Sequence, residues 1–321
     1  MSHISHLLSQ SGNFAGLPPP YSDYQSSRVA VLPVPYDGTT EWHSGTRNGP
    51  RAIIEASYYL EWYDIELGKE LHSMGIHTLP GIEPVMASPE AMNERVYSAV
   101  KSLLDDDKFI VMLGGEHSIS YGSIKAYSQK YPDFSVLQLD AHTDLRDQYL
   151  GTRFGHGCVM RRALEICPVT QVGVRSMSLE EHEFIESNRL SPFIVEHDSV
   201  DLSYSDIVDS LSNNVYVTID LDVLDPSIMA AVGTPEPGGM GWSDVLSLLR
   251  AVAGKRKIVG FDLVELCPDQ GPASCCFTAA KLAYKLIGYS FFAGERPVNH
   301  QVITQDAKVP PLIINTPNQR D

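Results

Sequence analysis

The sequence predicts an α/β domain in which one parallel sheet is covered by helices on both faces. Two observations along the 321 residues support this: short apolar runs alternate with segments of helical periodicity, and the runs contain few polar residues. Strands that are apolar on both faces are typical of parallel sheets, because crossover helices bury both sides. No repeat, linker or composition change divides the chain, and its 43% hydrophobic content suffices for one large core.

The predicted strands are short runs rich in Val, Ile and Leu. They span residues 30–36, 109–113, 134–140, 169–174, 214–220 and 257–266. Runs of this length bounded by turn residues are typical of strands buried on both faces. The run at 109–113 leads directly into Gly114 and Gly115, which marks a sharp end to that strand.

Segments with helical periodicity lie between these runs. The helices are predicted to begin after Pro50 and to span residues 88–104, about 119–130, 158–166, 178–187, 243–254 and 276–292. Ser88 and Pro89 begin the second of them, because serine caps free backbone N–H groups and proline is favoured in a first helical turn.

Both ends of the chain are expected to lie outside the folded domain. Residues 1–25 are predicted to form a flexible N-terminal arm. Residues 306–321 are rich in Pro, Asn and Gln and have no helical period, which predicts an extended C-terminal tail. A single domain is therefore expected over residues 26–305.

The composition argues against several classes of partner. A formal net charge of −16 disfavours nucleic acid and anionic membranes, because contacts with phosphate need clustered Lys and Arg. The same charge would favour a small cationic substrate, although acidity also serves solubility. Five cysteines without a C-x-x-C pair, no signal-peptide pattern and no membrane-length apolar run predict a reduced, cytoplasmic protein.

Acids and histidines gather where the predicted strands end. In "LDAHTDLRD", Asp140, His142 and Asp144 occupy alternate positions directly after a strand. Alternate residues of an extended chain point to the same side, and the carboxyl ends of parallel strands meet at one edge of a sheet. The other residues expected at this edge are His117, Asp220, Asp222 and Glu265.

Carboxylates packed this closely repel one another and would stay protonated unless a cation neutralised them. Five carboxylates and two imidazoles are more ligands than one ion uses, so two divalent cations are predicted. Oxygen-rich ligands with imidazole favour manganese over zinc, with nickel and cobalt as alternatives. A metal-free polar loop is the other interpretation of D-x-H-x-D alone. An EF-hand loop is excluded by Leu145 and Gly151, which stand where glycine and glutamate are required.

Five motifs occur in the order "GGEHS", "DAHTD", "TIDLDVLDP", "GTPEPGG" and "DLVEL". Together they resemble the ureohydrolase family, the arginases and agmatinases, over about residues 30–290. The stretch "HTDLRDQYLGTRFGHGCVMRR" is similar to the agmatinase branch. The resemblance implies a three-layer α/β/α domain with a mostly parallel eight-stranded sheet and a binuclear manganese centre.

The resemblance also implies roles for individual residues. His156, in "GHG", resembles the family's proton-shuttling histidine, which also contacts the substrate; capping of the following helix is the alternative. Glu265, in "DLVEL", resembles the carboxylate that holds the substrate guanidinium. Asp144 would accept a hydrogen bond from the attacking water and steer it. The metal ligands implied are His117, Asp140, His142, Asp144, Asp220 and Asp222.

The chemistry of this family is hydrolysis of a guanidino group to urea and an amine. Arginases hold the amino-acid head of arginine with an Asn- and Ser-containing loop after D-x-H-x-D, where this chain has "LRDQYLGTRFG". Agmatine, which would give putrescine for polyamine biosynthesis, is therefore the expected substrate. Aminopropyl-agmatine, guanidinobutyrate, guanidinopropionate, free guanidine and arginine remain alternatives. Family members assemble as trimers or hexamers, so a homo-oligomer is expected.

Several side chains are candidates for the mouth of the site. Arg153 is expected to contact the substrate there, where it would suit a guanidino acid. Arg146 is expected at the surface instead. Further candidates are Tyr36, Asp37, Trp42 and His43. Trp42 could alternatively pack at a subunit contact.

Two rival functions are compatible with a fold of this kind. A deacetylase-like amidase would use one zinc held by an Asp-His-Asp set, and "GGEHS" would then have no purpose. A non-catalytic regulator would be expected to have lost ligands, and none of the six is substituted here. Metal content separates the first rival from a two-metal hydrolase, and urea release separates the second.

Overall fold

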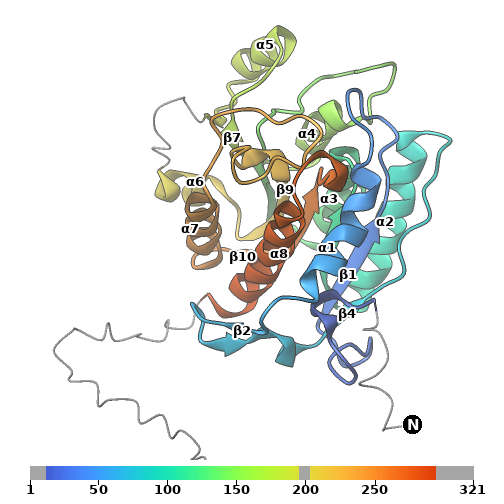
Figure 1. The fold of residues 1–321 in the computed structure, drawn as a ribbon. Helices are drawn as coiled ribbons and strands as arrows, with labels where there is room; N and C mark the ends of the chain where they lie inside the picture. Colours follow the sequence, from blue (N-terminus) through green and yellow to red (C-terminus); the bar gives the residue numbers. More distant parts are fainter. Residues whose placement is uncertain (1–11, 195–202, 294–321) are drawn as a thin grey trace, which may run out of the picture.

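An eight-stranded sheet runs through the middle of the computed structural model, which describes residues 12–194 and 203–293 (Figure 1). Across the sheet the strands are β4 (Ile76–Thr78), β1 (Val29–Val34), β5 (Phe109–Gly114), β10 (Lys257–Val264), β9 (Asn214–Asp220), β6 (Phe134–Leu139), β7 (Val169–Val174) and β8 (Phe193–Ile194). Every pairing in this sheet is parallel. The predicted parallel sheet is confirmed, with strand ends shifted by about two residues at most.

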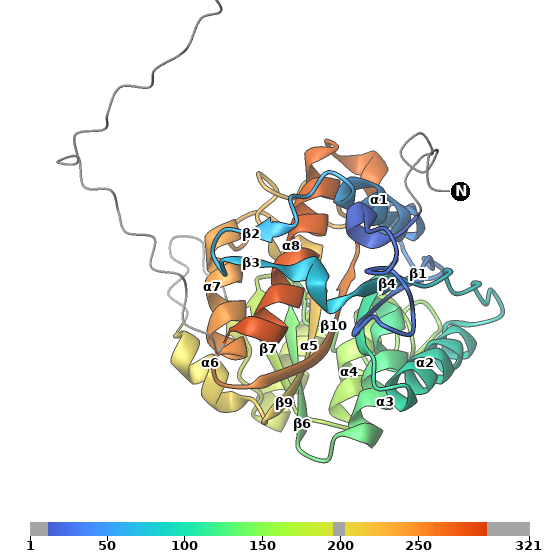
Figure 2. The ribbon, with the colours of Figure 1, turned by 90° about the horizontal axis from the view of Figure 1, so that it is seen from below.

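Helices cover both faces of the sheet and complete the three layers (Figure 2). One face packs against α1 (Gly49–Ser57), α6 (Tyr204–Ser210), α7 (Trp242–Ala253) and α8 (Ser274–Phe292). The other packs against α2 (Pro89–Asp105), α3 (Ser120–Lys130), α4 (Val159–Leu164) and α5 (Leu179–Asn188). Short 3₁₀ helices are η2 (Phe14–Gly16), η3 (Thr46–Asn48), η4 (Leu71–Met74), η5 (His117–Ile119), η6 (His156–Cys158), η7 (Leu221–Val223) and η8 (Pro268–Gln270). Among the described residues, no helix has both the length and the apolar character needed to cross a membrane.

The two faces of the strands supply two separate apolar cores, because successive side chains of a strand point to opposite sides. In β5, Val111 and Leu113 join the core that includes α1, α7 and α8. Ile110 and Met112 join the core that includes α2, α3 and α4. All four side chains are almost fully buried, which explains why this strand reads as a continuous apolar run.

The structure contains short elements that the sequence did not predict. The edge strands β4 and β8 have 3 and 2 residues. An antiparallel hairpin of β2 (Tyr63–Asp64) and β3 (Lys69–Glu70) precedes β4, and α6 has 7 residues. Segments this short span too few residues to show the periodic spacing of apolar side chains that identifies the longer strands and helices.

The described part of the N-terminal segment packs against the domain. Phe14 and Leu17 are fully buried, and the backbone N–H of Ala15 donates to Ser57 Oγ at 2.8 Å. The part of the predicted flexible arm from residue 12 onward is therefore anchored to α1. Residues 1–11 and the tail predicted over 306–321 lie outside the described residues.

The strand order brings distant parts of the sequence together. The neighbours β5, β10, β9 and β6 form the middle of the sheet, although they come from four separated stretches of the chain. Because these strands are parallel, their carboxyl ends lie at one edge. The acids and histidines that follow them are consequently brought to one place.

Candidate active site

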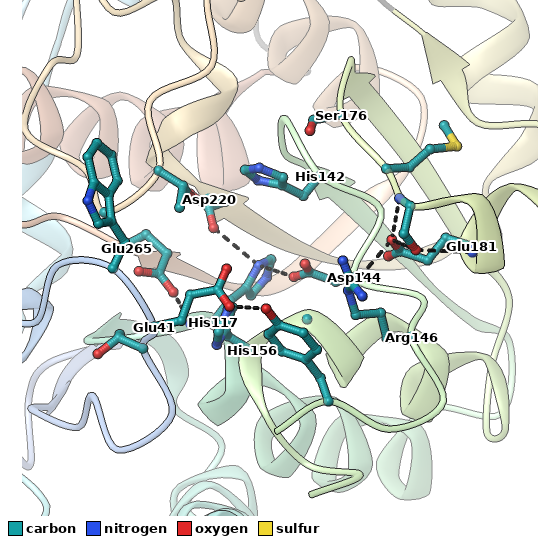
Figure 3. Close-up of a pocket in the computed structure, with 18 of the residues that line it drawn as sticks. Glu41, His117, His142, Asp144, Arg146, His156, Ser176, Glu181, Asp220 and Glu265 are labelled. Carbon is teal, nitrogen blue, oxygen red and sulfur yellow. Dashed lines mark hydrogen bonds and ion pairs between the residues drawn. The ribbon is translucent and has the colours of Figure 1, made fainter. Parts of the chain in front are cut away.

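A cavity of about 210 Å³ opens at the carboxyl edge of the four central strands (Figure 3). Side chains that follow these strands form its floor: His117, His142, Asp144, Asp220 and Glu265. The loops after β1, β6 and β7, together with residues 233–234, contribute its walls. The strand ends that the sequence singled out therefore share one cavity.

His117 is the centre of a first group of ligands. Its Nδ1 lies 3.0, 3.1 and 3.4 Å from carboxylate oxygens of Asp140, Asp144 and Asp220. Despite these short distances, Nδ1 has no hydrogen-bond partner of acceptable geometry among the described residues and is an orphaned buried atom. A nitrogen lone pair among carboxylate oxygens is a donor set that suits a divalent cation.

Hydrogen bonds behind His117 indicate which ring nitrogen carries the proton. Thr218 Oγ1 lies 2.8 Å from His117 Nε2 and donates its own hydrogen to Asp262 Oδ1 at 2.6 Å. Since its hydrogen is used, the hydroxyl accepts from Nε2–H. Nδ1 is left with its lone pair toward the carboxylates, the orientation that a metal ligand needs.

His142 forms a second group with Asp140 and Asp222. Its Nδ1 lies 3.0 Å from Asp222 Oδ2 and 3.6 Å from Asp140 Oδ1. In each group, His117 with Asp140 and Asp220, or His142 with Asp140 and Asp222, one ligand atom per residue lies within 4.8 Å of the others. Asp140 belongs to both groups and turns one oxygen toward each histidine.

The carboxylates of the floor resist ionisation in the protein alone. Burial raises the pKa of Asp144 to about 7, and the charge of Asp140 adds to this rise. Burial and the charge of Asp222 raise the pKa of Asp220 well above its usual value. Positive charge placed among them would remove this cost.

The surroundings of the two histidines at the floor favour their charged forms. Burial alone would lower the pKa of His117, but the neighbouring carboxylates of Asp140 and Asp144 outweigh it and raise that pKa. Burial is likewise outweighed at His142, where the charge of Asp222 raises the pKa. The floor thus attracts cations, and its residues fit a binuclear metal centre.

Two of the predicted catalytic carboxylates lie on strained backbone. Asp144 has φ of +53° and Glu265 has φ of +66°. Residues other than glycine rarely adopt this left-handed region, and such strain clusters at functional sites. Backbone hydrogen bonds hold both positions: the Asp144 carbonyl accepts from Met160 and Arg161 at 3.1 Å each, and Glu265 N–H donates to Gly115 at 2.7 Å.

Glu265 faces the cavity from the end of β10. Its Oε1 accepts the backbone N–H of His117 at 2.7 Å. Burial, with the charge of Glu116, raises the pKa of Glu265 well above its usual value. A guanidinium cation would stabilise the ionised carboxylate through charge-assisted hydrogen bonds.

The glycine pair Gly114–Gly115 at the end of β5 permits a close crossing of two loops. A Cβ atom at Gly115 would lie 1.9 Å from the backbone oxygen of Tyr36, and Glu116 N–H donates to that oxygen at 2.8 Å. Only glycine fits here without displacing the neighbouring backbone. The crossing brings the loop after β1, with Thr39, next to Glu116.

Thr39 orients His156 in the cavity wall. The backbone N–H of His156 donates to Thr39 Oγ1 at 3.1 Å, and its Nδ1 lies 3.3 Å from the same oxygen. Thr39 Oγ1 in turn donates to Glu116 Oε1 at 2.6 Å. Its hydrogen is used there, so it accepts from Nδ1–H, and Nε2 is left as the unprotonated ring nitrogen.

His156 is also set apart by its electrostatic surroundings. Burial lowers its pKa; the charge of Glu41 opposes this, and those of His142 and His117 add to it. Within residues 12–194 and 203–293, no side-chain hydrogen bond caps the N-terminus of η6 or α4, so His156 does not cap either helix. A neutral imidazole at the cavity wall can accept a proton.

The structure corrects two expectations about arginines. Arg153 does not line the cavity: its guanidinium lies 3.1 Å from Asp147 and 3.4 Å from Glu165, and 53% of its side chain is exposed. The expected position at the mouth is therefore not the one observed, because these surface carboxylates hold the guanidinium outside the cavity. Arg146, expected at the surface, lines the cavity, with its Nε 3.9 Å from Glu181.

Of the other four candidates for the mouth, two line the cavity and two do not. Trp42 and His43 line the cavity. Tyr36 and Asp37 are 3% and 5% exposed and lie elsewhere. Asp37 accepts the backbone N–H of Gly45 at 2.8 Å and so shapes the loop after β1 from below.

Residues that support the site were missed by the sequence reasoning: Thr39, Glu41, Glu116, Tyr149 and Glu181. For Glu181 a signal existed, since Ser178 and Glu181 form a capping box at the start of α5. Glu181 Oε1 also accepts from the Thr143 hydroxyl at 2.7 Å and from Leu145 N–H at 3.0 Å. It therefore fixes the loop that carries Asp144.

Known proteins are similar to this chain over most of its length. A family model described as "Arginase family" matches residues 27–288. The chain is 38% identical over 278 residues to the N(1)-aminopropylagmatine ureohydrolase of Synechocystis sp., covering 84% of this chain and 90% of that protein. It is 34% identical over 277 residues to the agmatinase of Pyrococcus horikoshii, covering 84% and 95%.

A solved structure supports the same comparison. The agmatine ureohydrolase of Thermoplasma volcanium superposes on this chain with a TM-score of 0.80 at 32% identity. The alignment covers 91% of this chain and 98% of that one.

Proposed function

This chain belongs to the arginase family, and from that premise we propose that it hydrolyses a small cationic guanidino compound to urea and an amine. Water adds to the guanidinium carbon, the bond from this carbon to the alkyl nitrogen breaks, and that nitrogen leaves as the amine. We propose agmatine or its aminopropyl derivative as the substrate, since relatives 34% and 38% identical are named for these compounds.

The two groups around His117 and His142 fit a binuclear centre. The proposed ligands are His117, Asp140, His142, Asp144, Asp220 and Asp222. We propose manganese, because carboxylate oxygens outnumber imidazole nitrogens and no thiolate is among them. Two divalent cations there would supply the positive charge that makes water a nucleophile near neutral pH.

Glu265 is the proposed anchor for the guanidinium. Its carboxylate lines the cavity beside the floor, and its Oε1 is held by His117 N–H. A carboxylate can accept two parallel N–H bonds from a planar guanidinium. Such a pair would fix the carbon that is attacked and would compensate the cost of a buried charge on Glu265.

Asp144 and His156 are the proposed groups that handle protons. In its ionised form the Asp144 carboxylate can accept a hydrogen bond from the attacking water and orient it. His156 begins neutral, with Nδ1–H on Thr39 and Nε2 free. Nε2 can take up the proton that the water releases and deliver it to the departing amine.

The observation that carries this proposal is the single cavity, in which two ligand groups share Asp140 and are flanked by Glu265 and His156. The test is urea release from agmatine, aminopropyl-agmatine, guanidinobutyrate, guanidinopropionate, guanidine and arginine, with manganese added and after chelation. Manganese-dependent turnover of a cationic amine, with arginine inert, is the expected result.

Two outcomes would contradict the proposal. One bound zinc, with hydrolysis of an amide and no urea, would assign the chain to the amidase rival. Two bound ions and no urea from any of the six compounds would leave the regulator or an untried amidine as the function. Metal content is therefore measured on the same preparation.

We also propose a homo-oligomer, a trimer or hexamer, as the family resemblance implies. Sedimentation equilibrium is the direct measurement, and a monomer would refute this. We propose a role in polyamine biosynthesis as well. The urea assay tests it, because the role requires that agmatine or aminopropyl-agmatine is the substrate.

A further inference from the structure

Two opposite charges, Glu41 and Arg146, line the walls of the cavity above its floor. Figure 3 draws the Glu41 side chain pointing into the cavity on the side of Glu265 and His156, whereas Arg146 lies beside Glu181. A substrate held at Glu265 must extend its tail between these walls. Their charges therefore act on whatever group ends the tail.

The charge of Arg146 is already compensated. Its Nε lies 3.9 Å from Glu181, a side chain that is almost fully buried, and its guanidinium lies 4.4 Å from the centroid of the Tyr149 ring. Packing on an aromatic face and beside a carboxylate satisfies a guanidinium. Arg146 is thus poorly available to a carboxylate on the substrate.

Glu41 differs from the other carboxylates of the cavity. Within the described residues, Asp144 and Asp220 face His117, Glu265 accepts the His117 N–H, and Glu181 accepts several donors. Glu41 is exposed, and its partner is the neutral hydroxyl of Tyr149. An ionised carboxylate bound only to a phenol keeps most of its attraction for a cation.

We propose that Glu41 receives the ammonium group at the far end of the substrate and thereby selects guanidines with a cationic tail. This inference rests on the proposed hydrolysis of a guanidino group and names the class of compound that the site takes. Trp42, which is 65% exposed beside Glu41, offers an aromatic face to the methylene chain or the ammonium. A zwitterionic head such as that of arginine would bring a carboxylate toward Glu41, where it is repelled.

The test compares the wild type with Glu41→Gln, which keeps the size and hydrogen-bonding capacity of the side chain and removes its charge. Glu55→Gln on α1 is the matched control, since Glu55 is exposed, pairs with Arg51 and does not line the cavity. Three substrates share the guanidino group: agmatine with a cationic tail, 1-butylguanidine with a neutral tail, and 4-guanidinobutyrate with an anionic tail. The readout is KM and kcat for each from urea release.

We expect Glu41→Gln to raise the KM for agmatine about tenfold, as for loss of a charge-assisted hydrogen bond. The KM for butylguanidine should be unchanged and that for guanidinobutyrate should fall. Glu55→Gln should behave as the wild type with all three.

An equal change in KM for agmatine and butylguanidine would overturn the inference, since it would indicate a general effect of the loop. No change with any substrate would overturn it as well. Absence of urea from all three compounds with the wild type would instead refute the proposed function on which the inference rests. The two failures are therefore distinguishable.

Discussion

The floor and the mouth of the cavity are built in different ways. On the floor and directly beneath it, His117, Asp140 and Asp222 are at most 2% exposed, and each is held by neighbouring groups. At the mouth, Glu41 and Trp42 are exposed on a loop, and within the part of the chain that the structure describes Glu41 bonds to one neutral group, the Tyr149 hydroxyl. The side chains at the floor are therefore fixed by several contacts each, whereas at the mouth the charge of the Glu41 carboxylate remains available to a ligand.

This difference separates chemistry from substrate choice. A buried group of acids and histidines fits the reaction that all members of a family share. Exposed side chains on surface loops can change with little cost in folding, because loops tolerate substitution. Changes on the floor should therefore abolish turnover with every substrate, and changes at the mouth should alter the preference among substrates.

The largest expected effect is that of Asp140→Asn, because Asp140 serves both ligand groups. In the wild type, Asp140 Oδ1 accepts the backbone N–H of His142 at 2.6 Å. Asparagine keeps an oxygen that can accept this bond but removes the charge. We expect loss of tightly bound metal and a fall in urea release of roughly 10⁴-fold, since several kcal/mol of charge stabilisation is lost. Metal analysis by plasma mass spectrometry and the urea assay measure the two effects.

Asp105→Asn is the control, since Asp105 is exposed at the end of α2 and pairs with Lys101. Circular dichroism should be the same for both variants. An Asp140→Asn protein that retains two ions per chain and normal turnover would show that the floor is not the metal centre.

The next effect concerns His156 and its pH dependence. We expect His156→Ala to keep both metal ions and to lower kcat roughly 100-fold. Because burial lowers the pKa of His156 from its usual value, the imidazole is neutral at pH 7 and becomes charged only in acidic solution. In the wild type, kcat/KM should therefore fall as the solution is made acidic.

The variant should lack that acid limb, although metal loss at low pH could still reduce its activity. Metal content is measured at each pH to separate the two causes. Unchanged turnover in His156→Ala, or an identical acid limb at constant metal content, would contradict the proton-transfer role.

The sequence predicted the floor of the cavity better than its mouth. The central strands were predictable because burial on both faces produces continuous apolar runs, and the floor was predictable because its residues follow those strands. The family resemblance carried by five motifs is confirmed by the match over residues 27–288. The edge strands β4 and β8 were missed because 2 or 3 residues carry no period.

The mouth was predicted less well, for a physical reason. Whether Arg146 or Arg153 reaches the cavity depends on which carboxylate each finds. Glu181, beside Arg146, comes from a distant helix, whereas Asp147 and Glu165, beside Arg153, are 6 and 12 residues from it along the chain. Thr39 was missed because its role arises from a loop crossing at Gly115 that no local pattern reveals. Tertiary contacts decide both cases.

A smaller effect is expected at Thr39, which stands between floor and mouth. Thr39→Val removes the hydroxyl that accepts from His156 Nδ1–H and donates to Glu116. We expect kcat to fall about tenfold, the value of one hydrogen bond, with little change in KM. Thr39→Ser should restore kcat, because serine keeps the oxygen.

A spectroscopic readout distinguishes positioning from packing. Nitrogen NMR of histidine-labelled, metal-free protein, with His156→Ala to assign the signal, should report the Nδ1–H tautomer in the wild type and in Thr39→Ser but a mixture in Thr39→Val. Equal losses of activity in the valine and serine variants, or a tautomer that does not change, would rule out the positioning role.

The smallest effect tests the division of the mouth itself, through two arginines whose positions are the reverse of those expected from the sequence. Arg146 lines the cavity and Arg153 does not. Glu181 and Tyr149 compensate most of the charge of Arg146, and the remainder lies on the path of a cationic tail. Arg146→Ala should therefore lower the KM for agmatine about two- to threefold, as expected for a partly screened charge. Arg153→Ala should leave it unchanged, because its guanidinium lies outside with Asp147 and Glu165. Butylguanidine, with a neutral tail, should distinguish neither variant from the wild type. If Arg153→Ala changed the KM for agmatine as much as Arg146→Ala, selection would depend on the net charge of the surface rather than on the cavity walls.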